Sequence, residues 1–479
     1  MQKIILLFFI SLVTALQLKT CQQAPSAIQA DLSADAPNPK QLYEKYCSGC
    51  HGQQMEAFAD RRWTYGTEHK DLVKGIKYGY EDGGMPAFDT TFTDQEIDAL
   101  ATYILEGIAK VEKYRFTNKK LPKTYQSEEL DYQLEKVVGN VEVPWGMAFL
   151  PNGDLLVTER GGGVYRANTK GDMQAIEGVP PVLAKNQGGM LDVALHPDFA
   201  NNQYVYLSYS IIKKENGKTL STTAINRGKL VGNRFTKSTK IFEALPYSTR
   251  RHHYGCRLVF DREGYLYFSV GDRGNRGKNP QSLGNHCGKI HRIYDDGRIP
   301  TDNPFVEQPK AKHSIYSYGH RNPQGVTLHP STGQIWTHEH GPRGGDEINI
   351  IRKGDNYGWP IISYGINYNG TTFTDKTHQS GMEQPLHYWI PSIGPSGMTF
   401  ITGDRYPAWK GDLLVGSLRF KYLNRCKIKD GKVIHEENLL KNVGRMRHVA
   451  MGPDGYIYVA VEGEEGRDGA VYRIVPTNS

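Results

Sequence analysis

The sequence predicts a multidomain protein, in which a small all-α domain is followed by an all-β six-bladed β-propeller. Three observations support this fold class. The chain has 479 residues, which is more than a single hydrophobic core usually supports. A helical pattern occupies the N-terminal part, and one β-hairpin pattern recurs six times beyond residue 135. The 52 glycines and 29 tyrosines are typical of a turn-rich and β-rich chain.

The N-terminus has the pattern of an export signal. Lys3 precedes an apolar run over 4–16, which is too short to span a bilayer but suits a signal-peptide core. We therefore expect residues 1–21 to be a signal peptide and the mature chain to be periplasmic or secreted. Cys21 is either the lipidated cysteine of a lipoprotein or follows ordinary cleavage. Lys19 favours ordinary cleavage, because small residues normally precede a lipidated cysteine.

The segment C-S-G-C-H at 47–51 has the spacing of a c-type haem attachment site. Cys47 and Cys50 would form the two thioethers, and His51 would lie under the iron. The alternative is a redox or zinc CxxC motif beside an incidental histidine. Met85 follows 34 residues after His51, on a loop stiffened by two glycines and a proline. We expect Met85 to be the sixth iron ligand, which would raise the reduction potential.

The helical pattern after Met85 supports the haem prediction. Thr93 and Glu96 form a capping box, and apolar residues follow at helical spacing from Ile97 to Ile104. This pattern resembles the C-terminal helix of a small class I cytochrome c. The resemblance predicts a cytochrome c domain over 36–112, with one covalent haem c. Because both axial positions would be filled, the haem should transfer electrons to a downstream acceptor, a cytochrome or an oxidase.

Residues 113–134 are rich in lysine and read as a linker, and 135–479 should form the propeller. In each repeat a β-rich run, a turn with Pro, Asp or Gly, and a second β-rich run indicate a hairpin. Spacings of about 45 to 75 residues leave room for two more strands per repeat, as in four-stranded propeller blades. The six repeats are 146–160, 190–210, 256–273, 325–341, 397–419 and 448–463.

The hairpin geometry predicts where function should lie. The residues before the first strand and after the second strand of each repeat should form a ring around one mouth of the central channel. Before the first strands lie Trp145, Gln187, His253, Arg321, Asn322, Gln324, Ser396, Arg445 and Arg447; after the second strands lie Arg160, Asp272, Gly341, Pro342 and Arg419. Several arginines converging on one opening predict a site for a polyanion, such as carboxylates or phosphates.

Several long motifs resemble the soluble PQQ-dependent aldose and glucose dehydrogenases. They are QGGMLDVALHPDF (187–199), HHYGCRL (252–258), GHRNPQG (319–325), HGPRGGDEIN (340–349), NYGWP (356–360) and GRMRHV (444–449). The resemblance covers about residues 135–475. It implies a six-bladed propeller that binds pyrroloquinoline quinone (PQQ) and Ca²⁺ at the channel mouth and oxidises aldose sugars at the anomeric carbon. PQQ carries three carboxylates, in agreement with the predicted arginine ring.

The resemblance also implies residue roles by matching position. His253 would be the general base, and Arg321 would stabilise the charge that develops on the quinone. The remaining PQQ or substrate contacts would come from Gln187, Asn322, Gln324, Tyr368, Pro395, Ser396, Gly397, Arg419, Arg445 and Arg447. Gly341 and Pro342 would offer carbonyl oxygens to Ca²⁺, and Glu347 with the backbone of Tyr357 would form a second calcium site.

Two positions depart from the glucose-specific members of that family. His252 stands where they have an acidic residue, and Ile390, beside Trp389, replaces an aromatic that stacks on the cofactor. These departures favour the broader aldose branch. Cys256 and Cys287 remain candidates for a disulfide, which export would permit.

Two other functions are alternatives to the sugar dehydrogenase. One is a non-catalytic propeller that binds carbohydrate or a partner protein beside an electron-transfer cytochrome. The presence of both His253 and the arginine ring argues against it. The other is an alcohol-oxidising quinoprotein, whose eight blades and repeated tryptophan motifs are not found in this sequence. The net charge of +7 is spread without a dense basic run, which argues against nucleic-acid binding.

Overall fold

The computed structural model describes residues 38–51, 55, 65–80, 85–111, 121–168, 170–463 and 468–477. The predicted signal peptide, Cys21 and most of the lysine-rich stretch before residue 121 lie outside these residues. So does the side chain of Cys50. Among the described helices, none is both long and apolar enough to cross a membrane.

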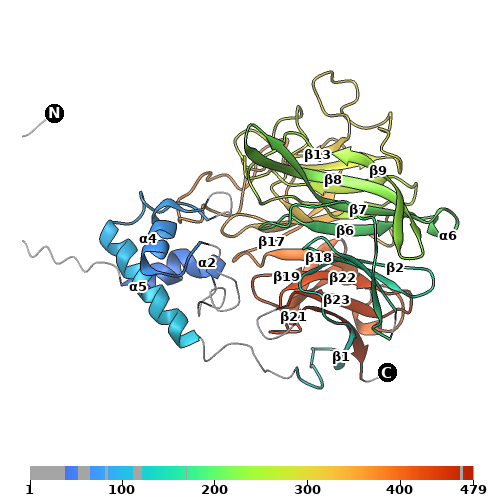
Figure 1. Cartoon of the computed structure of the whole chain (residues 1–479), viewed down its shortest axis with the longest axis horizontal. Helices are drawn as coiled ribbons and strands as arrows, with labels where there is room; N and C mark the ends of the chain where they lie inside the picture. The colour runs from blue at the N-terminus through green and yellow to red at the C-terminus, as the bar shows by residue number, and fades with distance from the viewer. Residues whose placement is uncertain are drawn as a thin grey trace, which may run out of the picture. The chain divides into compact units, whose positions relative to one another are not determined.

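The N-terminal helices are α1 (Pro39–Leu42), η1 (Tyr43–Cys47), α2 (Ser48–His51), α4 (His69–Tyr78) and α5 (Asp94–Val111). Helices α4 and α5, blue in Figure 1, contact each other. The capping box that predicted α5 is present, because the Thr93 N–H donates to Glu96 Oε2 (2.7 Å) and the Glu96 N–H donates to Thr93 Oγ1 (3.3 Å). This confirms the predicted start of the helix.

The apolar faces of these helices form one hydrophobic core. Leu100 and Ala101 of α5 are fully buried in it, together with Tyr43 of η1. Cys47 and Met85 are partly buried and pack against the same cluster. The Met85 backbone is tied to Tyr80 by two hydrogen bonds of 2.9 and 3.1 Å. Cys47, a candidate thioether residue, and Met85, the candidate axial ligand, therefore belong to one core.

In the described part of the chain, the β-strands form six antiparallel four-stranded sheets, which confirms the predicted propeller. Blade 1 contains β2 (Pro144–Phe149), β3 (Leu155–Glu159), β4 (Val164–Ala167) and β5 (Met173–Ala175). Blade 2 contains β6 (Met190–Leu195), β7 (Tyr204–Glu215), β8 (Lys218–Val231) and β9 (Arg234–Glu243). Blade 3 contains β10 (Leu258–Phe260), β11 (Leu266–Val270), β12 (Lys289–Ile293) and β13 (Ile315–Tyr318).

The remaining blades have the same order. Blade 4 contains β14 (Pro323–Leu328), β15 (Ile335–Glu339), β16 (Asp346–Ile351) and β17 (His387–Trp389). Blade 5 contains β18 (Pro395–Phe400), β19 (Leu413–Ser417), β20 (Leu423–Lys429) and β21 (Lys432–Leu439). Blade 6 contains β22 (Met446–Met451), β23 (Ile457–Val461), β24 (Ala470–Pro476) and β1 (Tyr132–Val138). Short helices α6 (Phe199–Asn202) and η4 (Pro407–Trp409) lie in loops. Each predicted hairpin is the first pair of strands of its blade.

Strand β1 closes the ring of blades. It pairs antiparallel with β24 at the other end of the chain, starting with Tyr132 opposite Pro476. The N–H and carbonyl of Tyr125 also pair with those of Tyr132, and both rings are buried in the core of this blade. The propeller therefore begins before residue 135, and residues 121–134 are not the linker that the sequence suggested.

A β-bulge recurs near the start of the first strand in five blades, all except blade 3. The extra residue is Trp145 in β2, Gln324 in β14, Gly397 in β18 and Arg447 in β22. A bulge leaves one residue out of the ladder and redirects its side chain. Three of the predicted mouth residues, Trp145, Gln324 and Arg447, lie at these bulges, which free them from strand pairing.

Arg257 satisfies the carbonyl groups that the bulges leave unpaired. Its guanidinium donates to the carbonyl oxygens of Gln324 (3.0 Å), Trp145 (3.1 Å) and Arg447 (2.6 Å). Its charge is balanced by Asp192 of β6 at 3.0 Å. Arg257 is 2% exposed, so this buried hub joins five of the six blades. The first strands therefore converge as the hairpin geometry predicted.

The candidate disulfide is not formed. Cys256 and Cys287 are both buried free thiols and pack in different hydrophobic clusters. Burial raises the pKa of Cys256 to about 12 and that of Cys287 to about 11. Both are therefore uncharged thiols of the core at neutral pH.

Candidate active site

The candidate general base is held by a buried carboxylate. His253 Nδ1 lies 2.7 Å from Oδ1 of Asp272, which follows β11 and is 1% exposed. Because a carboxylate only accepts hydrogen bonds, Nδ1 carries the proton and Nε2 is left as a proton acceptor. Burial and the neighbouring charge of Arg321 lower the pKa of His253 to about 4. The imidazole is therefore neutral at pH 7.

Asp272 is anionic in this arrangement. Burial by itself would raise its pKa, but the interactions with His253 and Arg321 lower the pKa below its ordinary value. Its oxygens accept two further hydrogen bonds, from the Gly274 N–H (2.7 Å) and from Trp359 Nε1–H (2.9 Å). The carboxylate is thus fixed by three donors, one of which is the candidate base.

The loop that carries His253 has an unusual backbone conformation. His253 has φ of +56°, in the left-handed region that residues with a Cβ seldom adopt. Gln187 Oε1 accepts a hydrogen bond from the His253 N–H (2.7 Å), and Asn322 Oδ1 accepts one from the Gly255 N–H (3.2 Å). These contacts come from two other blades and hold the loop in place. Gln187 therefore positions His253 through its backbone.

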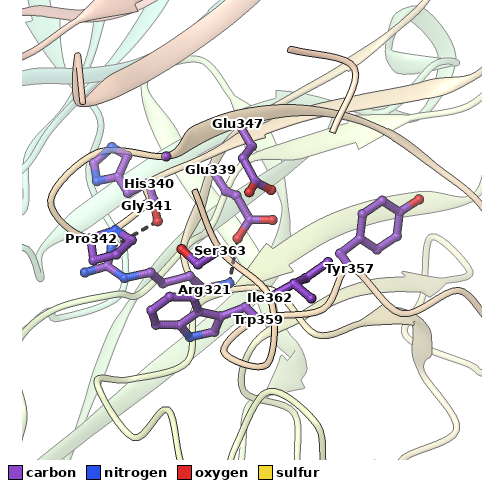
Figure 2. A pocket seen from close by; sticks show the side chains of 11 residues that line it. Arg321, Glu339, His340, Gly341, Pro342, Glu347, Tyr357, Trp359, Ile362 and Ser363 are labelled. Carbon is purple, nitrogen blue, oxygen red and sulfur yellow. Dashed lines mark hydrogen bonds between the residues drawn. The ribbon is translucent and has the colours of Figure 1, made fainter. Parts of the chain in front are cut away.

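Arg321 lies in a pocket that several predicted residues share. Its lining includes Arg321, Glu339, His340, Gly341, Pro342, Gly345, Glu347, Tyr357, Trp359, Ile362 and Ser363 (Figure 2). The Arg321 N–H donates to Glu339 Oε2 (2.5 Å), and its guanidinium donates to the carbonyl of His340 (3.0 Å) and to the Tyr368 hydroxyl (3.4 Å). The structure thus brings together Arg321, Tyr368 and the four residues predicted as calcium ligands.

Two acidic side chains enter the same pocket. Figure 2 shows the carboxylates of Glu339 and Glu347 close to each other. Burial and the charge of Glu339 raise the pKa of Glu347 to about 8. A buried and a partly buried carboxylate with a nearby carbonyl-rich loop fit a hard divalent cation, which would relieve the repulsion between the two carboxylates. No three His, Cys, Asp or Glu side chains of the described residues are placed to hold a metal ion together, so carbonyl oxygens and water would supply the other ligands.

The carbonyls of the predicted calcium loop are partly engaged. The Ser392 hydroxyl donates to the Pro342 carbonyl at 3.0 Å, which leaves one lone pair of that oxygen available. The Gly341 N–H donates to Asp346, which is buried and whose other oxygen accepts from the Gly394 N–H. The loop is therefore held in shape by its own hydrogen bonds.

A cluster of arginines surrounds Glu462 at the end of β23. Arg445 and Arg447 reach its Oε2 at 2.9 and 2.6 Å, and the charge of Arg160 also acts on it. Together the arginines lower the pKa of Glu462, although its burial opposes this. Burial lowers the pKa of Arg447 to about 9. Three guanidinium groups with one carboxylate leave an excess of positive charge, which suits a ligand with carboxylates.

Pro395, Ser396 and Gly397, which the sequence suggested as a turn, are the first residues of β18 and contact residues of two other blades. The Ser396 hydroxyl donates to the Arg447 carbonyl (2.9 Å), and the Pro395 carbonyl lies 2.7 Å from His340 Nε2. Gly397 has φ of +62°, and a Cβ there would lie 2.6 Å from the Cα of His448, so only glycine fits. Arg419 donates to the Ser392 carbonyl (2.9 Å). The described contacts do not place Arg419 against Arg445 or Arg447.

Asn322 and Gln324 are both buried near this centre. Gln324 Nε2 lies 3.5 Å from Asn322 Oδ1. Asn322 Nδ2 is a buried donor that finds no acceptor among the described residues. A buried donor without a partner in a cationic site fits an oxygen-bearing ligand, in agreement with the predicted role of Asn322 in cofactor binding.

The sequence assigned no role to several residues of this site. Asp272 and Arg160 belong to the predicted mouth ring, and His340 and Trp359 lie in the family motifs without a role of their own. Glu339 and Glu462 are not singled out by the sequence. Glu462 follows the second strand of its repeat, at the position that Asp272 and Arg160 occupy in theirs. The hairpin pattern could therefore have identified it.

The fold and these contacts define a six-bladed propeller oxidoreductase with a cytochrome c domain. The family model for glucose/sorbosone dehydrogenases matches residues 141–473, and that for subunit III of cbb3-type cytochrome c oxidase matches residues 34–104. The chain belongs to the glucose/sorbosone dehydrogenase family.

Individual relatives agree with this assignment. The chain is 40% identical over 352 residues to the aldose sugar dehydrogenase YliI of Escherichia coli, covering 72% of this chain and 93% of that protein. The apo crystal structure of the E. coli soluble aldose sugar dehydrogenase superposes with a TM-score of 0.67 at 37% identity, covering 72% and 99% of the two chains. The PQQ-bound aldose sugar dehydrogenase of Streptomyces coelicolor superposes with a TM-score of 0.58 at 27% identity, covering 72% of this chain and 98% of that one.

Proposed function

We propose that this chain is an exported quinoprotein that oxidises aldose sugars at the anomeric carbon with PQQ and passes the electrons singly to its own haem c. The proposal rests mainly on one observation at the mouth of the propeller. His253 is neutral, Asp272 orients it, and the charge of Arg321 is close enough to lower its pKa. The names of the relatives, which include aldose sugar dehydrogenases and a PQQ-bound form, support the same chemistry.

The residues at the mouth fit the cofactor. Arg445 and Arg447 would hold carboxylates of PQQ, and Asn322 Nδ2 would find its missing acceptor there. Glu347, with carbonyls of the same pocket, would hold Ca²⁺. When bound, PQQ would supply the two-electron acceptor for the hydride of the anomeric carbon.

The side chains divide the remaining work. His253 Nε2 would take the proton of the anomeric hydroxyl, so that the sugar leaves as its lactone. Asp272 would hold the His253 proton on Nδ1, so that Nε2 stays free to accept, and it would stabilise the imidazolium as it forms. Arg321 is held by Glu339 and His340, and it would keep a positive charge beside the reacting atoms without having to reorganise.

The haem would be the electron outlet. Cys47 and Cys50 would attach it, and His51 and Met85 would ligate its iron, so that it exchanges electrons rather than substrate. A downstream cytochrome or oxidase would then reoxidise it. Export fits this assignment, because the predicted signal peptide would deliver the chain to the periplasm, either free or anchored through Cys21.

Sugar-driven reduction of the haem tests the proposal. The purified full chain is loaded with PQQ and Ca²⁺, and haem absorbance is followed as aldoses or alcohols are added. We expect aldoses to reduce the haem and simple alcohols to leave it oxidised. If dithionite reduces the haem but no aldose does, the proposal fails and a non-catalytic propeller remains.

A variant pair assigns the base. His253→Ala should keep the haem spectrum and lose sugar-driven reduction. His329→Ala, which changes a partly buried histidine in the β14–β15 turn, should keep both. Full activity in the His253 variant would remove that residue from its proposed role.

A further inference from the structure

We propose that Trp359 is a positioning residue that fixes both Asp272 and Arg321 for catalysis. Its indole Nε1–H donates to Asp272 Oδ2 at 2.9 Å, while its ring lies 5.4 Å from the Arg321 guanidinium carbon, measured at the ring centroid. Trp359 thus contacts the residue that orients the base and the residue that supplies positive charge. The inference rests on the proposed function.

The hydrogen bond to Asp272 completes the set of donors around that carboxylate. His253 and the Gly274 N–H share Oδ1, whereas Oδ2 accepts from Trp359. Asp272 is 1% exposed, so water has little access to replace the indole. Without the indole N–H, the carboxylate could rotate about its side-chain bonds, and the Nδ1–H of His253 would lose its fixed acceptor.

The position of Trp359 is itself rigid. Its backbone N–H donates to the Gly319 carbonyl (2.8 Å), and its carbonyl accepts from Gln281 Nε2 (2.8 Å). Gln281 is in turn paired with Asn356 through both amide groups. The indole is therefore anchored to the loop before β12 and to the end of β13, which lets it act as a fixed donor.

The outer side of the indole is covered as well. Phe373 packs edge-on against it, with ring centroids 5.3 Å apart, and the Arg276 guanidinium lies 4.6 Å from the Phe373 centroid. Arg276 is tied to Asn367 at 2.7 Å. Trp359 is only 7% exposed as a result. The indole therefore lies between Phe373, which Arg276 covers, and Arg321 in the pocket, and its N–H donates to Asp272.

The charged and titratable groups that face His253 are Asp272, Arg321, His340 and His252. Trp359 contacts two of these four. Replacing it with phenylalanine removes the N–H but retains an aromatic ring below Arg321. The substitution therefore separates the hydrogen bond to Asp272 from the packing against Arg321.

The first measurement needs no cofactor and no substrate. In the PQQ-free full chain, with ¹⁵N-labelled histidine, the Nδ1–H resonance of His253 is identified by its loss in His253→Gln. We expect Trp359→Phe to shift this resonance and to accelerate its exchange with water. Trp409→Phe is the matched control, because Trp409 is a buried tryptophan whose Nε1 has no partner among the described residues. An unchanged resonance in Trp359→Phe would overturn the proposal.

The second measurement uses the PQQ- and Ca²⁺-loaded protein. We expect Trp359→Phe to lower kcat about tenfold, the size of one hydrogen bond to a charged group, with KM for the sugar within about twofold. In an Asp272→Ala background the same substitution should change kcat by less than about twofold, because no carboxylate is left to orient. A tenfold loss in both backgrounds would show that Trp359 does not act through Asp272.

Two further comparisons keep the result interpretable. Trp359→Tyr also lacks the indole N–H and should reproduce the loss of kcat, and melting temperatures confirm that each variant is folded. If no sugar reduces the haem of the unsubstituted chain, the proposed function fails. The His253 resonance then still decides whether Trp359 orients the pair.

Discussion

Asp272→Asn is the sharpest test of the proposed catalytic pair. Asparagine has nearly the shape of aspartate, but it has no charge and only one acceptor oxygen. The native carboxylate accepts N–H groups from His253 (2.7 Å), Gly274 (2.7 Å) and Trp359 (2.9 Å), and it is 1% exposed. In the variant, the amide NH₂ therefore has two possible arrangements. It faces one of these N–H donors, or it donates to His253 Nδ1, in which case the imidazole proton moves to Nε2.

The structure sets the expected size of the effect. A hydrogen bond to a charged group contributes about 1.5–3 kcal/mol, which corresponds to roughly 10- to 150-fold in rate. Protonation of Nε2 would in addition remove the base. We therefore expect kcat to fall by about 10²-fold or more, while KM for the sugar changes little because Asp272 lies behind His253 and away from solvent.

Stopped-flow reduction of the haem by an aldose measures this change in the PQQ- and Ca²⁺-loaded protein. Asp261→Asn is the matched control, since Asp261 accepts only backbone N–H groups in the turn between β10 and β11. It should retain kcat. If Asp272→Asn keeps kcat within about threefold of the unsubstituted chain, Asp272 does not orient a catalytic base.

Three further predictions concern the cofactor sites and pH. Arg447→Met should weaken PQQ binding by roughly 10- to 100-fold, measured by fluorescence titration, because it removes a buried guanidinium from the cationic cluster. Ca²⁺ should raise the Tm of the unsubstituted chain but not that of Glu347→Gln, and it should release protons at pH 7 because the pKa of Glu347 is raised to about 8. Burial lowers the pKa of His253, His286 and His340 to about 4. These histidines are therefore protonated in the unfolded chain but not in the folded chain between pH 4 and 6.5. The free energy of unfolding should fall over this range by about 1.4 kcal/mol per group for each pH unit of acidification. Urea midpoints at pH 7.5 and 5 should show this loss, and equal midpoints would contradict it.

The parts of the fold that were predictable depend on local sequence. Alternation and turn residues identified the first two strands of every blade, and Thr93 with Glu96 identified the start of α5. The mouth ring also followed from local pattern, because a hairpin places its two ends together. Arg321 and Pro342 come from such ends and share one pocket.

The parts that were not predictable depend on contacts between distant residues. The first three residues of β1 fall within the predicted linker, because nothing near Tyr132 in the sequence shows that it pairs with Pro476. Glu339 appeared to be an ordinary strand residue, although its carboxylate holds the Arg321 N–H and faces Glu347. Trp359 was part of a recognised motif, but its donation to Asp272 requires two loops to meet.

The bulges explain why this fold concentrates reactive side chains at one mouth. In a regular first strand, the N–H and carbonyl groups of Gln324 and Arg447 would form hydrogen bonds with the neighbouring strand. Their side chains would then point to the faces of the sheet. The bulge removes both residues from pairing. Arg257 donates to the carbonyls of both, and the Ser396 hydroxyl is a second donor to the carbonyl of Arg447. Arg257, whose charge Asp192 balances, therefore provides hydrogen bonds to bulge carbonyls of several blades at once. This offsets the cost of burying these carbonyls. The site and the Arg257 hub therefore depend on the same irregularity in the strands.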